Sequence, residues 1–248
     1  MADTSRSDHL PNLRADRQPP HPSWLPRQRH GTTPQMIGRY PDFDVLDSAD
    51  TWDAATTRVV FARLEPPGPL RFFTAAEEPT LRAFCDTVLA QDCEPRVPVA
   101  EFVDDKLAAG RLDGYQYADM PDDRETWRMV LRALDATATE SAGVVGFAQA
   151  DESRRLDIVG KFAAAELDGP QWRQLNVSRA WSVCMRMVLA AFYSHPWAWN
   201  EIGFGGPAYP RGFMRLGGPS GPAAVREPFE KGGATDENPV QAVQKEGL

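Results

Sequence analysis

The sequence predicts an all-α protein: an irregular bundle of about five helices, with an extended N-terminal arm and a C-terminal tail rich in glycine, proline and aromatic residues. Five segments of the 248-residue chain repeat apolar residues every three or four positions, which is the spacing of an amphipathic helix. No segment of useful length alternates apolar with polar residues, as a half-buried strand would. The 22 prolines and 19 glycines cluster toward the two ends, where they favour extended chain over packed core.

The N-terminal arm divides into two parts. Residues 1–33 are rich in Pro, Arg and His and have no hydrophobic period, so we expect a disordered, solvated arm. Residues 34–69 contain aromatic anchors among turn residues, a short helix capped by Ser48 or Asp50, and a proline-rich hinge at their end. This second part is predicted either to wrap around a partner or to pack back on its own domain.

The first two helices of the bundle have clear start signals. Thr74 and Glu77 have the spacing of a capping box. The apolar face that follows consists of Leu81, Phe84, Cys85, Val88 and Leu89. The second helix is expected to run from Pro98, a residue type favoured at the first helical position, to Gly110, a residue type favoured as a C-terminal cap.

Three more helices are predicted from the same periodicity. The third lies in residues 121–138, with acidic residues in its first turn, and turns inward Trp127, Val130, Leu131 and Leu134. The fourth lies in residues 151–169 and turns inward Leu156, Val159, Phe162 and Ala163. The fifth lies in residues 176–196, where Pro196 stops it, and turns inward Trp181, Cys184, Met185, Val188 and Phe192.

Composition and charge exclude several classes of function. The net charge of −8 and the pI near 5.1 argue against nucleic acid as a partner. The longest apolar run is too short to span a membrane, and the first 30 residues show no secretory signal, so we expect a cytoplasmic protein without membrane insertion. The three cysteines lack CxxC spacing, which argues against a zinc site. Cys85 is expected in the core, and a disulfide with Cys93 is the alternative that requires a bend after the first helix.

Catalytic motifs are missing from the sequence. No GxGxxG follows a strand, and neither a GxSxG nor a phosphate-binding loop is present. His195 stands at a predicted helix end before a proline, where imidazole commonly caps carbonyl groups. The acidic pairs Asp104/Asp105 and Asp122/Asp123 fall on predicted solvent faces or helix N-termini. We therefore expect no catalytic, cofactor-binding or metal-binding residue in this chain.

The block "FYSHPWAWNEIGFGGPAYPRGFMRLG", residues 192–217, is the most unusual part of the sequence. It combines aromatic residues with Gly and Pro turns and almost no charge, and it is predicted to form neither regular helix nor strand. Aromatic side chains on rigid turns are typical of interface anchors, and the alternative is that they cap the open end of the bundle. The predicted partner contacts are Trp197, Trp199, Phe204, Tyr209 and Phe213, with Tyr40 and Phe43 of the arm as second choices.

Two stretches carry a resemblance to a known family. The opening "FFTAAEEPTLRAFCDTVLAQD" with "PVAEFVDDKLA", and the block "AFYSHPWAWNEIGFGGPAYPRGFMRLG", are similar to the gluconate 2-dehydrogenase subunit 3 family over residues 70–217. Residues 218–248 would then be a flexible tail. The family consists of small helical subunits of bacterial flavin-dependent sugar and alcohol dehydrogenases, which act on CH–OH donors.

The resemblance implies a non-catalytic accessory subunit without a cofactor of its own. Its partner would be the FAD-containing large subunit of the glucose-methanol-choline (GMC) oxidoreductase type, which it would bind and stabilise, and a cytochrome c subunit is a further candidate partner. Many family members carry a twin-arginine signal, whereas this sequence has a polar arm in its place. Either the complex is cytoplasmic, or the partner carries the signal and the complex is exported to the periplasm. The competing hypotheses are a stand-alone helical binding or regulatory module and an enzyme that uses His195 with an acidic residue.

Overall fold

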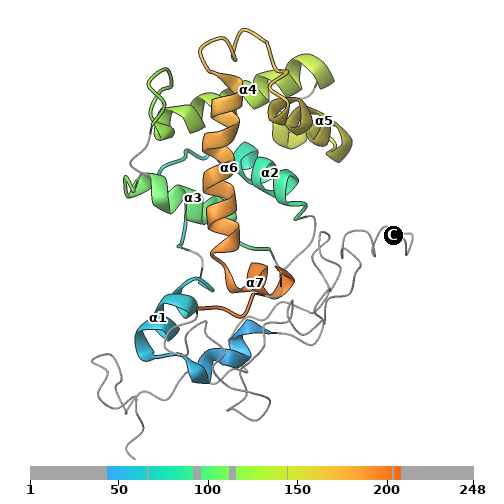
Figure 1. The fold of residues 1–248 in the computed structure, drawn as a ribbon. Helices are drawn as coiled ribbons and strands as arrows, with labels where there is room; N and C mark the ends of the chain where they lie inside the picture. Colours follow the sequence, from blue (N-terminus) through green and yellow to red (C-terminus); the bar gives the residue numbers. More distant parts are fainter. Residues whose placement is uncertain are drawn as a thin grey trace, which may run out of the picture. The chain divides into compact units, whose positions relative to one another are not determined.

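The computed structural model describes residues 44–65, 67–91, 96–111, 116–143, 145–202 and 204–207 (Figure 1). Every regular element in these residues is helical, which confirms the predicted all-α class. The described residues form two compact units. The larger unit comprises residues 65–195, and the smaller unit joins residues 44–64 to residues 196–207. The predicted arm 1–33 and tail 218–248 lie outside the described residues.

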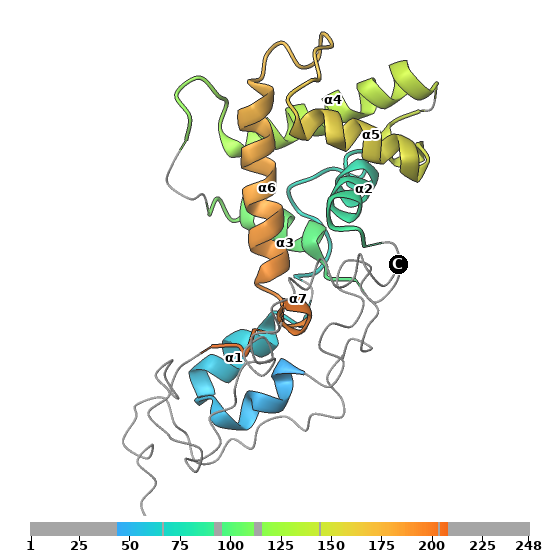
Figure 2. The ribbon, with the colours of Figure 1, turned by 45° about the vertical axis from the view of Figure 1, so that its right-hand side comes forward.

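The larger unit contains the five predicted helices. They are α2 (Glu78–Leu89), α3 (Val99–Ala108), α4 (Asp123–Ala142), α5 (Glu152–Ala163) and α6 (Val177–Tyr193), with the 3-10 turn η3 (Phe147–Gln149) between α4 and α5. The long helix α6 packs on α3 and α4, while α2 packs on α5 and η3; both views show α6 crossing α4 (Figures 1 and 2).

Side-chain caps fix where three of these helices begin. The side-chain oxygens of Asp122, Asp151 and Asn176 each accept a hydrogen bond from the backbone N–H three residues later, at 2.9, 2.9 and 3.2 Å. Each bond satisfies an N–H group that has no partner within its own helix, and each cap stabilises the helix by about 1 kcal/mol. The starts of α4, α5 and α6 are therefore encoded locally.

The predicted capping box forms, but it does not begin the helix. Thr74 N–H donates to Glu77 Oε2 at 2.8 Å, and Glu77 N–H donates to Thr74 Oγ1 at 3.3 Å. The box closes a turn, and α2 starts after it at Glu78 with Pro79 in its first turn. A proline is tolerated there because first-turn N–H groups have no intrahelical partner.

An aromatic cluster forms the centre of the larger unit. The ring centroid of Phe84 lies 6.1 Å from Trp127, 6.2 Å from Phe162 and 6.5 Å from Trp181. The indole N–H of Trp127 donates to the sulfur of Met187 at 3.1 Å, so its polar atom is satisfied inside the core. The inward positions predicted for α4 are confirmed, since Trp127, Val130, Leu131 and Leu134 are all buried. One core thus joins α2, α4, α5 and α6.

Helix α5 presents a different face from the one predicted. Leu156, expected inside, is 51% exposed, and Ala163 is also exposed. The helix instead buries Ile158, Val159 and Phe162 on the side that meets α2 and α4. Leu156 precedes Ile158 by two residues, which at roughly 100° per residue puts it on nearly the opposite side. The apolar stripe of α5 is therefore wider than the surface that its neighbours cover.

The smaller unit contains three short elements: η2 (Val45–Thr51), α1 (Ala54–Ala62) and α7 (Pro196–Ile202). The predicted caps Ser48 and Asp50 are wrong, because both lie inside η2 and the carboxylate of Asp53 caps α1 by accepting Thr56 N–H at 2.8 Å.

The expectation of an irregular block after residue 192 is also wrong in part. Residues Pro196–Ile202 form the helix α7. The missing N–H of Pro196 prevents α6 from continuing, yet it costs nothing at the first position of a new helix. The same proline therefore ends one helix and begins the next.

Gly206 is required where the two segments of the smaller unit meet. Its φ is +78°, and a Cβ there would lie 2.9 Å from Val45 Cγ2 and 3.0 Å from Trp52 Cζ2. We expect Gly206→Ala to destabilise this unit by roughly 2–3 kcal/mol through backbone strain and overpacking. Hydrogen exchange in residues 44–64 should rise. Gly143→Ala is the control, because Gly143 also has a positive φ (+65°) but an added Cβ there would have no atom within 4 Å. This variant should therefore show the cost of backbone strain alone. An equal loss of stability in the two variants would refute the packing argument.

Candidate partner-binding surface

The smaller unit ties the segment before the helical body to the segment after it. Asn200 of α7 accepts a hydrogen bond from Val45 N–H at 2.7 Å, and its amide nitrogen donates to Asp44 Oδ1 at 3.3 Å. Asp44 also accepts Leu46 N–H at 3.0 Å and so caps η2. Residues 44–64 thus pack on the C-terminal block of the same chain.

The predicted aromatic anchors lie largely inside. Trp199 is only 4% exposed, with the guanidinium of Arg63 5.6 Å and the ring of Phe204 5.5 Å from its ring centroid. Trp197 is buried as well, whereas Phe204 is half-buried. These side chains pack within the smaller unit of the chain itself. Their contact with a partner stays a prediction. The other predicted anchors, Tyr40, Phe43, Tyr209 and Phe213, lie outside the described residues.

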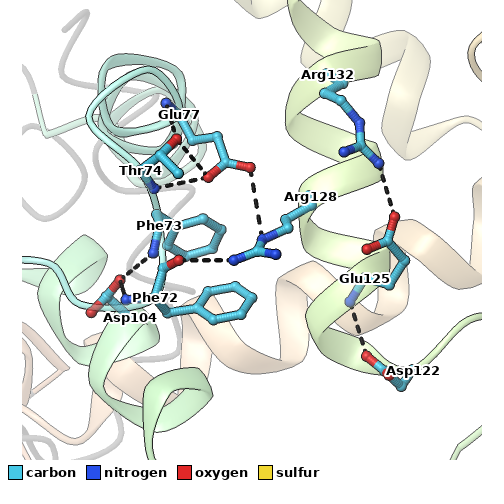
Figure 3. A network of polar contacts seen from close by, with 9 residues as sticks. All are labelled: Phe72, Phe73, Thr74, Glu77, Asp104, Asp122, Glu125, Arg128 and Arg132. Atoms are coloured by element: carbon cyan, nitrogen blue, oxygen red, sulfur yellow. Dashed lines mark hydrogen bonds and ion pairs between the residues drawn. The ribbon is translucent and has the colours of Figure 1, made fainter.

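In the larger unit, residues 71–77 form a strap fastened by a buried carboxylate (Figure 3). Asp104 of α3 is 2% exposed, and it accepts backbone N–H groups of Arg71 at 2.7 Å and of Phe72 and Phe73 at 2.9 Å each. The prediction that Asp104 faces solvent is therefore wrong. The sequence carries no signal for this role, because the three donors are main-chain groups more than 30 residues away.

Helix α4 holds the strap from its other side. Arg128 donates to the carbonyl oxygen of Phe72 at 3.1 Å and lies 3.9 Å from the Glu77 carboxylate, as Figure 3 shows. Two guanidinium groups lie near the Phe72 ring, at 4.4 Å (Arg128) and 4.9 Å (Arg124) from its centroid. These contacts leave the strap with backbone and side chain both fixed.

A groove with a volume of about 510 Å³ opens beside the strap. It is lined by Gly68, Pro69, Leu70, Phe73, Ala75, Glu78, Arg82 and Glu101. Arg82 bridges Glu78 at 2.8 Å and Glu101 at 2.7 Å. Partial burial opposes the charge of Arg82, but hydrogen bonds to the two carboxylates outweigh it and raise the pKa of the guanidinium. The groove thus combines apolar lining residues with three charged side chains that are paired with one another.

Two more of the residues singled out by the sequence, His195 and Asp123, are buried. His195 is buried, its backbone N–H donates to Phe192 O at 3.0 Å, and its ring lies 6.3 Å from that of Phe102. Asp123 lies in the first turn of α4, which confirms its predicted place at a helix N-terminus, and there it is buried with Arg186 at 3.3 Å. In the described part of the chain, no cluster of three or more His, Cys, Asp or Glu side chains could hold a metal ion. Nor is any helix within the described ranges long and apolar enough to cross a membrane.

Cys85 and Cys184 are buried free thiols, which confirms the core position predicted for Cys85. Burial raises the pKa of both thiols well above the usual range, and nearby acidic groups add to the effect. Above about pH 8.5 the unfolded chain loses these protons while the folded chain keeps them. Stability should therefore fall by roughly 1.4 kcal/mol per thiol for each further pH unit.

Urea unfolding of the wild type and of a Cys85→Ala/Cys184→Ala variant across the alkaline range measures this effect. The wild type should lose stability faster than the variant as the pH rises. Parallel pH profiles would contradict the proposed burial of the two thiols.

Five large apolar side chains are exposed in the described residues: Val59, Val145, Leu156, Leu189 and Tyr193. Three of them lie on different elements, Val59 on α1, Val145 in the loop after α4 and Leu156 on α5. Leu189 and Tyr193 both lie on α6, four residues apart. Single exposed apolar residues are normal, so the α6 pair is the one that indicates a contact surface.

Comparison with known proteins identifies a family. The family model described as Gluconate 2-dehydrogenase subunit 3 matches residues 75–206, more than half of the chain. No curated protein and no solved structure matches the chain. The matched range begins in the strap, includes all helices of the larger unit and α7, and ends at Gly206.

Proposed function

We propose that this chain, which belongs to the gluconate 2-dehydrogenase subunit 3 family, binds and stabilises an FAD-containing large subunit of the GMC oxidoreductase type. Family membership carries this proposal, since the family is that of an accessory subunit in a multi-subunit dehydrogenase. In this proposal the chain stabilises its partner by binding it and catalyses no reaction itself.

The described residues support a structural role. Two buried carboxylates of the larger unit have structural partners, since Asp104 binds the strap and Asp123 pairs with Arg186. The ionisable groups that line the groove beside the strap are paired with one another. Two large apolar side chains remain exposed on α6. This combination favours recognition of another protein over catalysis.

In the proposed complex the flavin belongs to the large subunit. There it would take the hydride from the hydroxyl-bearing carbon of the sugar or alcohol. The small subunit would stabilise the flavin-bound fold by mass action, because it binds the folded large subunit and not the unfolded one; at 100 times its dissociation constant this contributes about 2.7 kcal/mol.

The experiment is co-expression of the tagged chain with a gluconate 2-dehydrogenase large subunit from the same organism, followed by affinity capture and an absorbance scan. The proposal predicts a stoichiometric complex with the visible absorption band of bound flavin. The matched control is the large subunit expressed with the untagged chain. A colourless eluate that contains this chain alone would reject the proposal and favour a stand-alone binding module.

A further inference from the structure

We infer that the groove beside the strap binds a lysine or arginine side chain presented by the flavoprotein large subunit. The inference rests on the proposed function for the identity of the partner, while the site and its charge come from the structure. The described residues that line the groove all belong to the larger unit. The volume of about 510 Å³ falls in the range of roughly 300–1,000 Å³ that is typical of binding sites for small organic groups.

The charged side chains of the groove pair with one another but do not balance. Arg82 of α2 pairs with Glu78 of the same helix at 2.8 Å and with Glu101 of α3 at 2.7 Å. One guanidinium against two carboxylates leaves this triad with a formal charge of −1. In both pairs Arg82 contacts the oxygen Oε1, and no described residue donates to Oε2 of either glutamate. The triad can therefore accept a second cation without losing the first.

The surroundings add negative charge and supply no second cation. Arg82 is the one basic residue among the described residues that line the groove. Arg71 of the strap already pairs with Asp105. Glu65 is exposed and has no ion-pair partner in the described chain, and it lies three residues before the lining residue Gly68, so at most about 11 Å from it. A positively charged group is the complementary ligand.

The apolar wall of the groove favours a long basic side chain as that ligand. Leu70 and Phe73 line the groove together with the triad. Phe73 is fixed, because its backbone N–H donates to Asp104 at 2.9 Å and its ring meets that of Trp127 edge-on at 6.0 Å. Lysine and arginine lay their methylene groups along apolar surface and keep the charged head beside polar groups. A rigid wall also loses little entropy when such a side chain binds.

A metal ion fits the groove less well. Calcium takes about six to eight oxygen ligands, whereas the groove offers two carboxylates that share an arginine. Across the described ranges, no group of three or more His, Cys, Asp or Glu side chains could hold a metal ion. The ligand is therefore an organic cation.

The net charge of the chain argues against a second copy as the source of this cation. The chain carries a net charge of −8, so two copies repel each other at long range. Arginine is enriched in interfaces between different proteins and is one of the residue types that contribute most to their binding energy. A basic side chain on the large subunit satisfies both conditions.

The test changes the charge of the triad in the full-length chain and repeats the capture with the large subunit. Glu78→Gln/Glu101→Gln changes the formal charge from −1 to +1 and should lower the captured flavin at least about tenfold. The matched control is Glu125→Gln, which removes the carboxylate of a one-to-one pair with Arg132 on α4. This variant should stay within about twofold of the wild type.

A third variant separates binding from folding. Arg82→Gln makes the triad more negative, from −1 to −2, so it should capture at least as much flavin as the wild type. If the triad mattered only for packing α2 against α3, Arg82→Gln would lower the capture as strongly as the double glutamine variant. Circular dichroism of each variant checks that the helices are retained.

A further measurement does not depend on the folding of the charge variants. A photoreactive phenylalanine analogue placed at Ala75, an exposed residue that lines the groove, should cross-link to the large subunit. The same group at Val145, which is 90% exposed and is not among the residues that line the groove, should not.

Other outcomes overturn the inference in distinguishable ways. If the wild type and the double glutamine variant capture equal flavin, the proposed function stands and the assignment of the groove is wrong. If the wild type captures no flavoprotein, the proposed function fails and this inference fails with it. If Ala75 cross-links only within this chain or to a second copy of it, the groove is occupied by the chain itself and the inference is wrong.

Discussion

Replacing Phe84 by alanine is expected to lower the free energy of unfolding by about 4 kcal/mol. Phe84 is fully buried, and its ring meets Trp127, Phe162 and Trp181 from three different helices. Alanine would remove the apolar area and leave a cavity that rigid aromatic neighbours cannot fill.

Urea unfolding followed by circular dichroism measures this change. Phe84→Leu keeps most of the volume and should cost less than about 1.5 kcal/mol. Leu156→Ala, at an exposed site, should stay within about 0.5 kcal/mol of the wild type. A loss below about 2 kcal/mol for Phe84→Ala would mean that the cluster is not the centre of the core.

Asp104→Ala is expected to lower the free energy of unfolding by about 3–4 kcal/mol, because it leaves the three backbone N–H groups of the strap without their acceptor. Asp104→Asn should cost less, since one oxygen can still accept the bonds from Phe72 and Phe73 while the amide nitrogen would face Arg71 N–H.

The neighbouring residue supplies the control for this prediction. Asp105 is next in sequence, but it pairs with the exposed arginines Arg71 and Arg111. Asp105→Ala should therefore change stability by less than about 1 kcal/mol. Equal losses at the two positions, measured by urea unfolding, would show that Asp104 contributes no more than a surface charge.

The helices of the larger unit could be predicted from the sequence because their signals are local. The stripe in α4 that contains Trp127 and Leu131 repeats at helical spacing, and Asp122 supplies a cap directly before it. Such patterns depend only on residues within one or two turns. They determine where a helix lies, but not which part of its apolar stripe a neighbour will cover, as Leu156 shows.

Long-range contacts explain most of what the sequence could not predict. The bond between Val45 and Asn200 joins residues 155 positions apart, and no periodicity reports such a pairing. Asp104 carries a role that depends on main-chain donors in the strap, which have no side-chain signature. For the same reason the sequence leaves open whether the aromatic block meets a partner or packs on its own chain, whereas the structure buries Trp197 and Trp199.

Helix α6 illustrates the same limit from the other direction. Periodicity places Met185 on the inward side of its helix together with Cys184 and Val188. The structure buries Cys184 and Val188 and leaves Met185 half-buried. When the apolar stripe of a helix is wider than one packing surface, the sequence pattern is the same whether the outer edge of the stripe contacts a partner or solvent.

The central claim is that this chain binds a flavin-containing large subunit. Sedimentation velocity detected at the visible absorption band of flavin tests it most directly, because only the flavoprotein would be seen in the proposed complex. Addition of the purified chain should shift the whole flavin boundary to a larger sedimentation coefficient and saturate at one chain per flavin. A flavin boundary that does not move at any excess of the chain would contradict the account.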